Sequence, residues 1–403
     1  MVLFHSLPVF AQDDKSETRQ NQGAPAKFLP DISLNVDFSG VYRNLDQNAF
    51  GSLYYPGYAE TEYGDTINPL NGFNFNYAEF GMYSAVDPFF DLSVTFHLTV
   101  DTFEIEEAYA RTLSLPANLQ LKLGKFLSSF GRLNEVHAHA WDFSDQPLVY
   151  HVFFGMEDLN EIGLRLTWLI PAPFYLLAGA EALTGRNPVS FGSTGFSNPG
   201  GTMKVDNGSS PEIYLGYLKT SFDLNDLVIL AGVSAANGTK RFDNGILSTD
   251  GYGVSGNSTI LGTDLTLKWI VDASRFLAWQ TEYLYRIVDG NMYYNSGTND
   301  SYTAKQSGLY SQIIFQFTKG LRTGFRFDLL QKNEVLIGGA SQNYVENSTR
   351  YSLMLEYAPS EFSRFRLQYN YDPSGYNGSS ATDNHQIAIN ANFHIGSHGS
   401  HSF

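Results

Sequence analysis

Two histidines separated by a single residue are the feature of this chain best suited to metal chemistry. His137 and His139 stand in the sequence His-Ala-His, and alternate side chains of an extended backbone point to the same side. The pair could therefore hold one divalent ion such as Zn²⁺, with His151 as a third nitrogen ligand. A structural role fits the spacing equally well, with hydrogen-bonded histidines locking a folded loop to its surroundings. Acids nearby in the sequence that could complete an N/O site are Glu135, Asp142 and Asp145.

Other kinds of chemistry find no support in the sequence. Cysteine is absent, which excludes disulfides, thiolate metal sites and cysteine nucleophiles. No Ser/His/Asp arrangement, phosphate-binding glycine loop or paired-carboxylate motif has a supporting context, so we expect no enzyme and no required cofactor. With 25 Lys+Arg against 41 Asp+Glu the formal charge is −16, which argues against nucleic acid as a partner. The same charge would attract cations to the mouths of a pore.

The elements that must position the histidines are strands with one apolar and one polar face. In residues 321–329, 350–357, 364–371 and 386–393, apolar side chains mostly alternate with polar ones. Segments of about ten residues suit tilted strands that cross a bilayer, and no run approaches the roughly 18 apolar residues of a membrane helix. A soluble β-sandwich or jelly roll would also alternate, but its outward face would be polar. We therefore predict an all-β, transmembrane antiparallel β-barrel.

Turns and loops alternate along the chain in a way that predicts the topology. Short turns, as at Asn225-Asp226 and Lys319-Gly320, alternate with long loops, which we place at 128–160, 237–257 and 289–307. The strands number about sixteen. In bacterial barrels the short turns are periplasmic and the long loops extracellular, so an even count places both ends in the periplasm.

The third extracellular loop, residues 128–160 and called loop 3 here, carries the histidines. It contains too many apolar and aromatic side chains to lie in water, so we expect it to fold into the barrel and narrow the channel. The residues that we assign to this constriction are Arg132, Glu135, Trp141, Asp142 and Asp145.

The inward-facing positions of the predicted strands form a charged lumen, with a basic wall on three neighbouring strands near the C-terminus. One interpretation is a transverse field across a water-filled pore that orients charged solutes. The other is that these side chains only keep the lumen wet. The predicted pore-lining residues are His97, Arg165, Asp264, Lys268, Glu282, Arg286, Arg322, Arg326, Arg350, Glu356, Arg364 and Arg366.

The two ends of the chain fit an exported barrel. Residues 1–11 look like the remnant of a signal peptide, residues 12–30 like a disordered periplasmic lead-in, and residues 31–403 form the predicted barrel. The terminal aromatic, Phe403, is a feature that exported barrels commonly present to the barrel-assembly machinery. Weaker candidates for metal binding in the Gly- and Ser-rich tail are His394, His398 and His401.

Several motifs in and around loop 3 are distinctive, as is the ending Gly396-Ser-His-Gly-Ser-His-Ser-Phe403. The motifs are Leu123-Gly-Lys-Phe126, Phe130-Gly-Arg-Leu-Asn134, His137-Ala-His-Ala-Trp-Asp-Phe143, Asp145-Gln-Pro-Leu148 and Leu159-Asn-Glu-Ile-Gly163. Together they resemble a family of zinc-regulated outer-membrane barrels, some members of which are labelled TonB-dependent receptors. The resemblance implies a barrel associated with zinc supply, with His137 and His139 at matching positions. The histidine pair itself makes Zn²⁺ at loop 3 a candidate ligand.

The receptor label fits this chain poorly. TonB-dependent receptors have about 22 strands and a plug domain, and 403 residues in about sixteen strands leave no room for a plug. We predict a porin-like channel in the outer membrane of a Gram-negative bacterium, for passive diffusion of small solutes, with divalent cations such as zinc as candidates. The alternative is a receptor or adhesin whose barrel is plugged by loop 3. Expected partners are outer-membrane lipid, the assembly machinery and, in a homotrimer, further copies of the chain.

Overall fold

The computed structural model describes residues 30–51, 53, 55–57, 67–342, 346–377 and 380–396. The expected signal-peptide remnant, nearly all of the lead-in and the C-terminal aromatic lie outside these residues. Within the described part of the chain, no helix is both long and apolar enough to cross a membrane.

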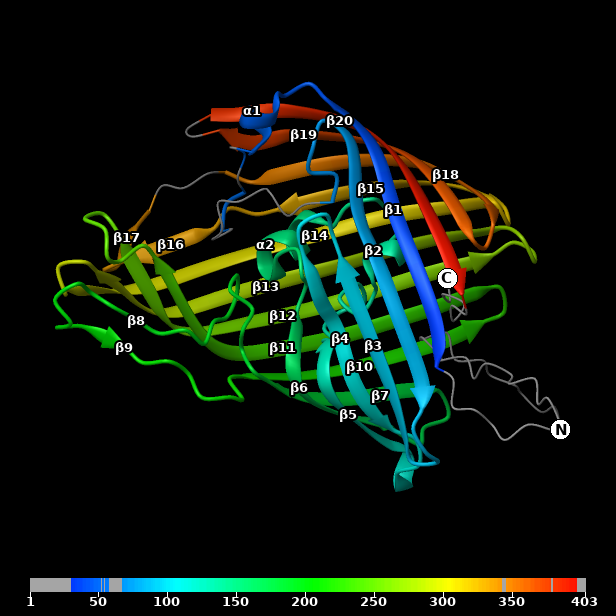
Figure 1. The fold of residues 1–403 in the computed structure, drawn as a ribbon, viewed down its shortest axis with the longest axis horizontal. Helices are drawn as coiled ribbons and strands as arrows, with labels where there is room; N and C mark the ends of the chain where they lie inside the picture. The colour runs from blue at the N-terminus through cyan, green and yellow to red at the C-terminus, as the bar shows by residue number, and fades with distance from the viewer. Residues whose placement is uncertain are drawn as a thin grey trace.

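Sixteen antiparallel strands form a closed barrel, because the first strand pairs with both the second and the last (Figure 1). The predicted fold class is confirmed. The barrel strands are β1 (Asp31–Arg43), β2 (Gly72–Ala85), β3 (Phe90–Leu98), β4 (Phe103–Thr112), β5 (Leu119–Leu127), β6 (Asn160–Leu169), β7 (Tyr175–Leu183), β10 (Ile213–Leu224), β11 (Leu227–Asn244), β12 (Tyr252–Ile270), β13 (Phe276–Tyr294), β14 (Asn299–Thr318), β15 (Leu321–Leu330), β18 (Ser348–Ser360), β19 (Ser363–Asn377) and β20 (Ser380–Gly396).

Shorter elements occupy the loops between these strands. Figure 1 shows the two small hairpins together at the left end of the barrel. The additional elements are α1 (Gln47–Gly51), η2 (Pro116–Asn118), η3 (Ala138–Ala140), α2 (Leu148–Phe154), and the hairpin strands β8 (Phe196–Ser197), β9 (Lys204–Val205), β16 (Glu334–Ile337) and β17 (Ala340–Ser341).

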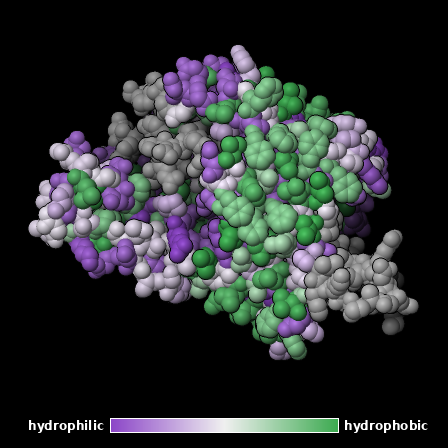
Figure 2. Space-filling view, in the orientation of Figure 1, coloured by the Kyte–Doolittle hydropathy of each residue, from purple (hydrophilic) through white to green (hydrophobic). Residues whose placement is uncertain are grey.

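The alternation of side chains along each strand gives the barrel its two faces. On β18, Leu353 is 55% exposed on the outer face, whereas its neighbour Ser352 is fully buried inside. Figure 2 shows the apolar outer surface over β1–β5, with polar surface toward the end that carries the small hairpins. A closed barrel satisfies every strand's backbone groups internally, so this outer face can lie in lipid.

Four strands extend farther than the alternation predicts. The loops predicted at 237–257 and 289–307 were largely wrong, because β11 pairs with β12 as far as Asn244, and β13 with β14 from Asn299. These extensions lie beyond the lipid-facing belt, where neither face needs to be apolar. Their backbone pairing continues without the pattern that marks a membrane strand.

A charged side chain placed on the outer face should destabilise the barrel more, the deeper it lies in the bilayer. Ile389 lies within β20, and Ile395 lies one residue before the periplasmic end of that strand; both are exposed. Ile389→Arg should lower the free energy of unfolding by about 2–4 kcal/mol, and Ile395→Arg by about 0–1 kcal/mol. Denaturant titration of protein folded into lipid vesicles measures both values. Equal effects at the two positions would contradict a lipid-facing β20.

Candidate functional site

Loop 3 lies inside the barrel rather than over its mouth. It connects β5 to β6, and its helix α2 follows Pro147 and ends at Gly155, which has a positive φ of 78°. All seven residues of α2 are buried, and the helix packs against β14 and β15. Figure 1 shows α2 within the barrel.

An apolar core joins loop 3 to one side of the lumen. The rings of Phe130 and Phe154 meet edge to face with centroids 5.3 Å apart. They belong to one buried cluster with inward-facing strand residues, among them Ile260, Leu284 and Tyr310. Sequence reasoning missed these inward apolar residues because, where β12–β14 pass loop 3, both faces of these strands carry apolar side chains. One side of the lumen is therefore filled as a protein core would be.

The five arginines of the predicted basic wall all contact loop 3. The guanidinium groups of Arg322, Arg326 and Arg350 pair with loop carboxylates, and Arg364 and Arg366 donate to loop carbonyls. The contacts are Arg322 with Asp142 (2.8 Å), Arg326 with Asp145 (2.9 Å), Arg350 with Asp145 (3.2 Å), Arg364 with the carbonyl of His139, and Arg366 with the carbonyl of Trp141 (2.7 Å). Glu356 lies between Arg322 and Arg366, at 2.6 and 2.7 Å, and offsets their charge.

Carboxylates hold loop 3 to further strands of the barrel wall. Glu282 of β13 accepts hydrogen bonds from the backbone N–H groups of Arg132 (2.8 Å) and Leu133 (3.0 Å). It also accepts from the hydroxyls of Tyr150 (2.8 Å) and Tyr310 (2.5 Å). A buried carboxylate with four donors is well satisfied, so Glu282 acts as an anchor for the start of the loop.

The next carboxylate along the loop binds cations on two further strands. Glu135 of loop 3 pairs with Arg165 of β6 at 2.6 Å and with Lys219 of β10 at 3.1 Å. Burial alone would raise the pKa of Glu135, but the two cations outweigh it and hold that pKa far below its usual range. Loop 3 is thus tethered around most of the circumference of the barrel.

The other predicted pore-lining residues also face the interior. Arg286 donates to the carbonyls of Val152 in loop 3 (3.2 Å) and of Gly57, which lies between α1 and β2 (2.9 Å). Asp264 is buried opposite Glu282 on the neighbouring strand. His97 packs its ring edge-on against Tyr77, with centroids 5.3 Å apart. A role in selectivity for any of these stays a prediction.

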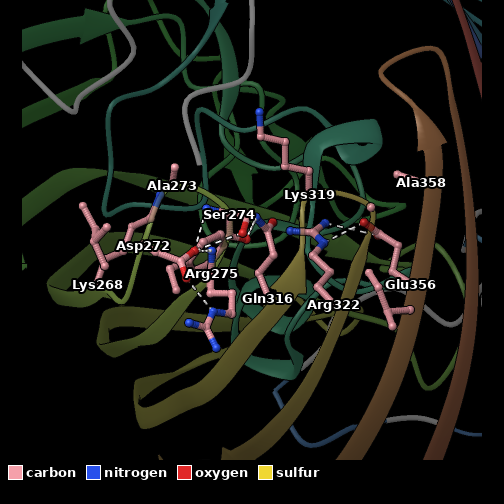
Figure 3. Close-up of a pocket in the computed structure, with 14 residues that line it drawn as sticks. Lys268, Asp272, Ala273, Ser274, Arg275, Gln316, Lys319, Arg322, Glu356 and Ala358 are labelled. Atoms are coloured by element: carbon pink, nitrogen blue, oxygen red, sulfur yellow. Dashed lines mark hydrogen bonds and ion pairs between the residues drawn. The ribbon is translucent and has the colours of Figure 1, made fainter.

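A cavity of roughly 450 Å³ opens at the periplasmic end, among the short turns. Figure 3 shows Lys268, Asp272 and Arg275 on one side and Arg322 with Glu356 on the other. Arg322, which lines the cavity, also binds Asp142 of loop 3. The cavity forms a charged vestibule below the loop.

A second, small cavity lies between loop 3 and the wall formed by β1, β2, β19 and β20. It is lined by polar side chains and by Ala138 and Ser144 of the loop. Four buried polar atoms in this region have no hydrogen-bond partner in the described structure. These atoms are Asn68 Nδ2, Ser144 Oγ, Asn390 Oδ1 and Asn392 Nδ2. We call the four residues that carry them the asparagine seam.

His137 and His139 meet carboxylates that project from β2 and β4. The Nε2 of His137 lies 3.0 Å from Glu107, and its Nδ1 lies 3.4 Å from Glu106 and 3.7 Å from Glu79. His139 binds Glu79 through Nδ1 at 2.8 Å and stacks on His137, with centroids 5.7 Å apart. Sequence reasoning missed these glutamates as partners, although the run Glu104-Ile-Glu-Glu107 visibly interrupts the alternation of its strand.

The two imidazoles have opposite electrostatic environments. Burial lowers the pKa of His137, but the carboxylates of Glu106 and Glu79 outweigh it and hold that pKa well above its usual value. Burial and the neighbouring His137 together hold the pKa of His139 well below its usual value.

The structure does not bring His151 into this group. His151 lies in α2, where its ring faces Tyr55. Burial, with the charge of Arg350, lowers its pKa to about 4. Among the described residues, the set whose potential ligand atoms all lie within 4.8 Å of one another is Glu79, Glu106 and His137. The acids expected to supply oxygen ligands bind cations or amides of the barrel wall instead, namely Glu135, Asp142 and Asp145.

Comparison with known proteins shows one family relative and a shared fold. No family model matches the chain. A protein of Aquifex aeolicus, described as uncharacterized, is 43% identical over 380 residues, which cover 93% of this chain and 80% of that protein. The description of that protein does not mention zinc.

The solved structures with a similar fold are outer-membrane proteins. The outer-membrane channel DcaP of Acinetobacter baumannii has a TM-score of 0.57 at 10% identity, with 91% of this chain and 97% of that chain covered. The outer-membrane protein OmpT of Vibrio cholerae has a TM-score of 0.54 at 12% identity, with the same coverage of both chains. Another structure of OmpT is described as a trimer form. The chain is an outer-membrane β-barrel of the Gram-negative type.

Removing an anchor of loop 3 should loosen that loop selectively. Glu282→Gln keeps the shape of the side chain but leaves buried donors without a charged acceptor, which should cost about 2–4 kcal/mol of local stability. Hydrogen exchange of the amides at 131–136 should accelerate accordingly. The matched control is Glu161→Gln, since Glu161 accepts hydrogen bonds from Gly185 and Asn187 in the loop that follows β7 and not from loop 3. Equal acceleration at 131–136 in both variants would refute the anchor.

Proposed function

We propose that this chain, which belongs to the same protein family as the uncharacterized Aquifex aeolicus protein, is a porin-like channel. Small solutes would diffuse through it passively, past loop 3, between the extracellular mouth and the charged vestibule. The fold it shares with the channel DcaP supports this proposal. The observation that carries it is the asparagine seam.

The asparagine seam contains buried polar atoms that need a partner. A buried polar group without a hydrogen bond costs free energy, so groups such as Asn390 Oδ1 and Asn392 Nδ2 require water. The adjoining cavity is roughly 10 Å³, about the volume that one water occupies when counted by its centre. We infer that water enters here, and that solutes follow the seam because the apolar core fills the other side of the lumen.

The charges around the small cavity balance, because Asp37 and the nearby Glu356 offset Arg364 and Arg366. Asp37 of β1 accepts hydrogen bonds from Asn76 (2.6 Å) and Asn390 (3.3 Å) and lines the small cavity opposite Arg364 and Arg366. Arg366 already binds Glu356, which offsets its charge. With the formal charge of −16 on the whole chain, we propose a preference for cations, including divalent ions such as zinc.

The tethering of loop 3 favours a second candidate function. A loop held by ion pairs on both sides of the lumen could also plug the barrel of a receptor or adhesin, which would bind its partner through the long extracellular loops. The two functions differ in whether the folded protein conducts ions.

We propose two kinds of macromolecular partner besides lipid. The trimer form described for OmpT makes a homotrimer the assembly to test. The barrel-assembly machinery is the expected partner during insertion, as for other outer-membrane barrels.

Conductance in planar bilayers tests the channel. Wild-type protein should give ohmic steps and a reversal potential that indicates cation preference in a KCl gradient. Asp37→Asn should lower the permeability ratio of K⁺ to Cl⁻ by roughly a factor of two, because it removes a charge at the narrow seam.

The control for this measurement removes the same charge elsewhere. Asp289 is exposed on the extension of β13, and Asp289→Asn should leave the ratio unchanged. Absence of current from a folded sample would overturn the channel and favour the plugged receptor. Equal effects of the two variants would place the conduction path away from the seam.

A further inference from the structure

We propose that Glu79, Glu106 and His137 form a binding site for one divalent transition-metal ion, which fastens loop 3 to β2 and β4. One imidazole and two carboxylates make a donor set suited to Zn²⁺ and similar ions. The three ligands come from three separate segments, so an ion bound here would join the loop to the barrel wall.

The hydrogen bond of His137 to Glu107 leaves the other ring nitrogen available. Glu107 is a carboxylate, so the Nε2–H of a neutral His137 donates to it over 3.0 Å. The lone pair is then on Nδ1, which has no hydrogen-bond partner in the structure. A carboxylate that orients a histidine through the ring nitrogen opposite the ligand nitrogen is a common arrangement around bound zinc.

The spacing of the ligand atoms suits a bound ion. Nδ1 of His137 lies 3.4 Å from Glu106 and 3.7 Å from Glu79. Ligands at about 2.0–2.2 Å from a tetrahedral Zn²⁺ lie roughly 3.3–3.6 Å from one another. Two carboxylates at such distances repel a nitrogen lone pair, so Nδ1 must carry either a proton or a bound cation. A proton on Nδ1 is the competing explanation, and the experiment below separates it from a metal.

Burial and supporting contacts point to the same conclusion. Glu79, Glu107 and His139 are buried, whereas the side chains of His137 and Glu106 keep 19% and 20% of their surface exposed. An ion could therefore reach the site from the lumen. Glu107 also accepts from the backbone N–H of Leu127 (2.9 Å), and His139 holds Glu79. The ligands are thus fixed in place, as a specific site requires.

Occupancy of this site would change how firmly the first half of loop 3 is held. His137 lies at one side of the asparagine seam, since its neighbour Ala138 lines the small cavity. Metal binding should therefore stabilise the constriction. Only this consequence for conduction rests on the proposed channel function; the binding site itself does not.

Equilibrium binding of Zn²⁺ to the full-length folded protein in detergent, after treatment with a chelator, tests the site. Wild-type protein should bind one tight Zn²⁺ per chain. Glu106→Gln and His137→Gln should each weaken that binding by roughly 100-fold or more, and Glu107→Gln by about 10–100-fold. A zinc anomalous difference peak between Glu79 and His137 in crystals would give the position directly.

Three controls make the result decisive. His151→Gln, in α2, should retain the tight site, and so should a variant with both His398 and His401 changed to Ala. Circular dichroism of each variant verifies that the barrel has folded. The proposal is overturned if wild type binds Zn²⁺ no more tightly than Glu106→Gln, or if His151→Gln loses as much affinity as His137→Gln.

Binding and conductance can fail separately. Tight Zn²⁺ with no current from wild type would reject the channel and keep the metal site. Normal current without tight Zn²⁺ would reject the metal site and keep the channel.

Discussion

A charged side chain inside the barrel needs an ion pair, hydrogen bonds or water, and in this protein loop 3 supplies the paired groups. Lipid around the barrel requires an apolar outer face, so the ionisable side chains of the strands are directed inward. Many of them would be costly to bury alone. The loop meets them with Asp142, Asp145 and Glu135 and with backbone carbonyls and N–H groups. Because both walls bind it, the position of the loop follows from the charges of the strands.

The same loop divides the lumen into two unlike halves. Toward β10–β15, its aromatic and aliphatic side chains form a core with inward-facing strand residues such as Leu284. Toward β1, β2, β19 and β20 the interface is polar, and single atoms of the asparagine seam, such as Asn390 Oδ1, have no protein partner. The apolar half stabilises the loop, and the polar half is where we propose that water enters. This asymmetry reconciles a tightly fixed loop with the proposed function in diffusion.

The histidine segment lies at the edge of the polar half. His137 and His139 contact three glutamates of the wall, so this stretch of the loop is held by groups that bind both protons and metal ions. The arginine contacts, by contrast, keep their charges at any physiological pH. The adjustable part of the constriction is therefore confined to the segment beside the seam, while Glu282 and the arginines hold the rest.

The sequence by itself determined the features that depend on local periodicity. The outward Leu353 and Ile389, the inward Arg326 and the apolar character of loop 3 all follow from which face of a strand meets lipid. It did not reveal the extensions of β11–β14, because a strand in water needs no apolar face.

Only the tertiary structure decided which side chains the histidines contact. Glu79, Glu106 and Glu107 precede His137 in sequence by different distances and lie on two strands that both pair with β3, and the inward fold of loop 3 brings His137 to them. His151 is near His139 in sequence, yet α2 turns it toward Tyr55. Contacts across a lumen join residues distant in sequence, and no spacing along the chain encodes which of them will meet.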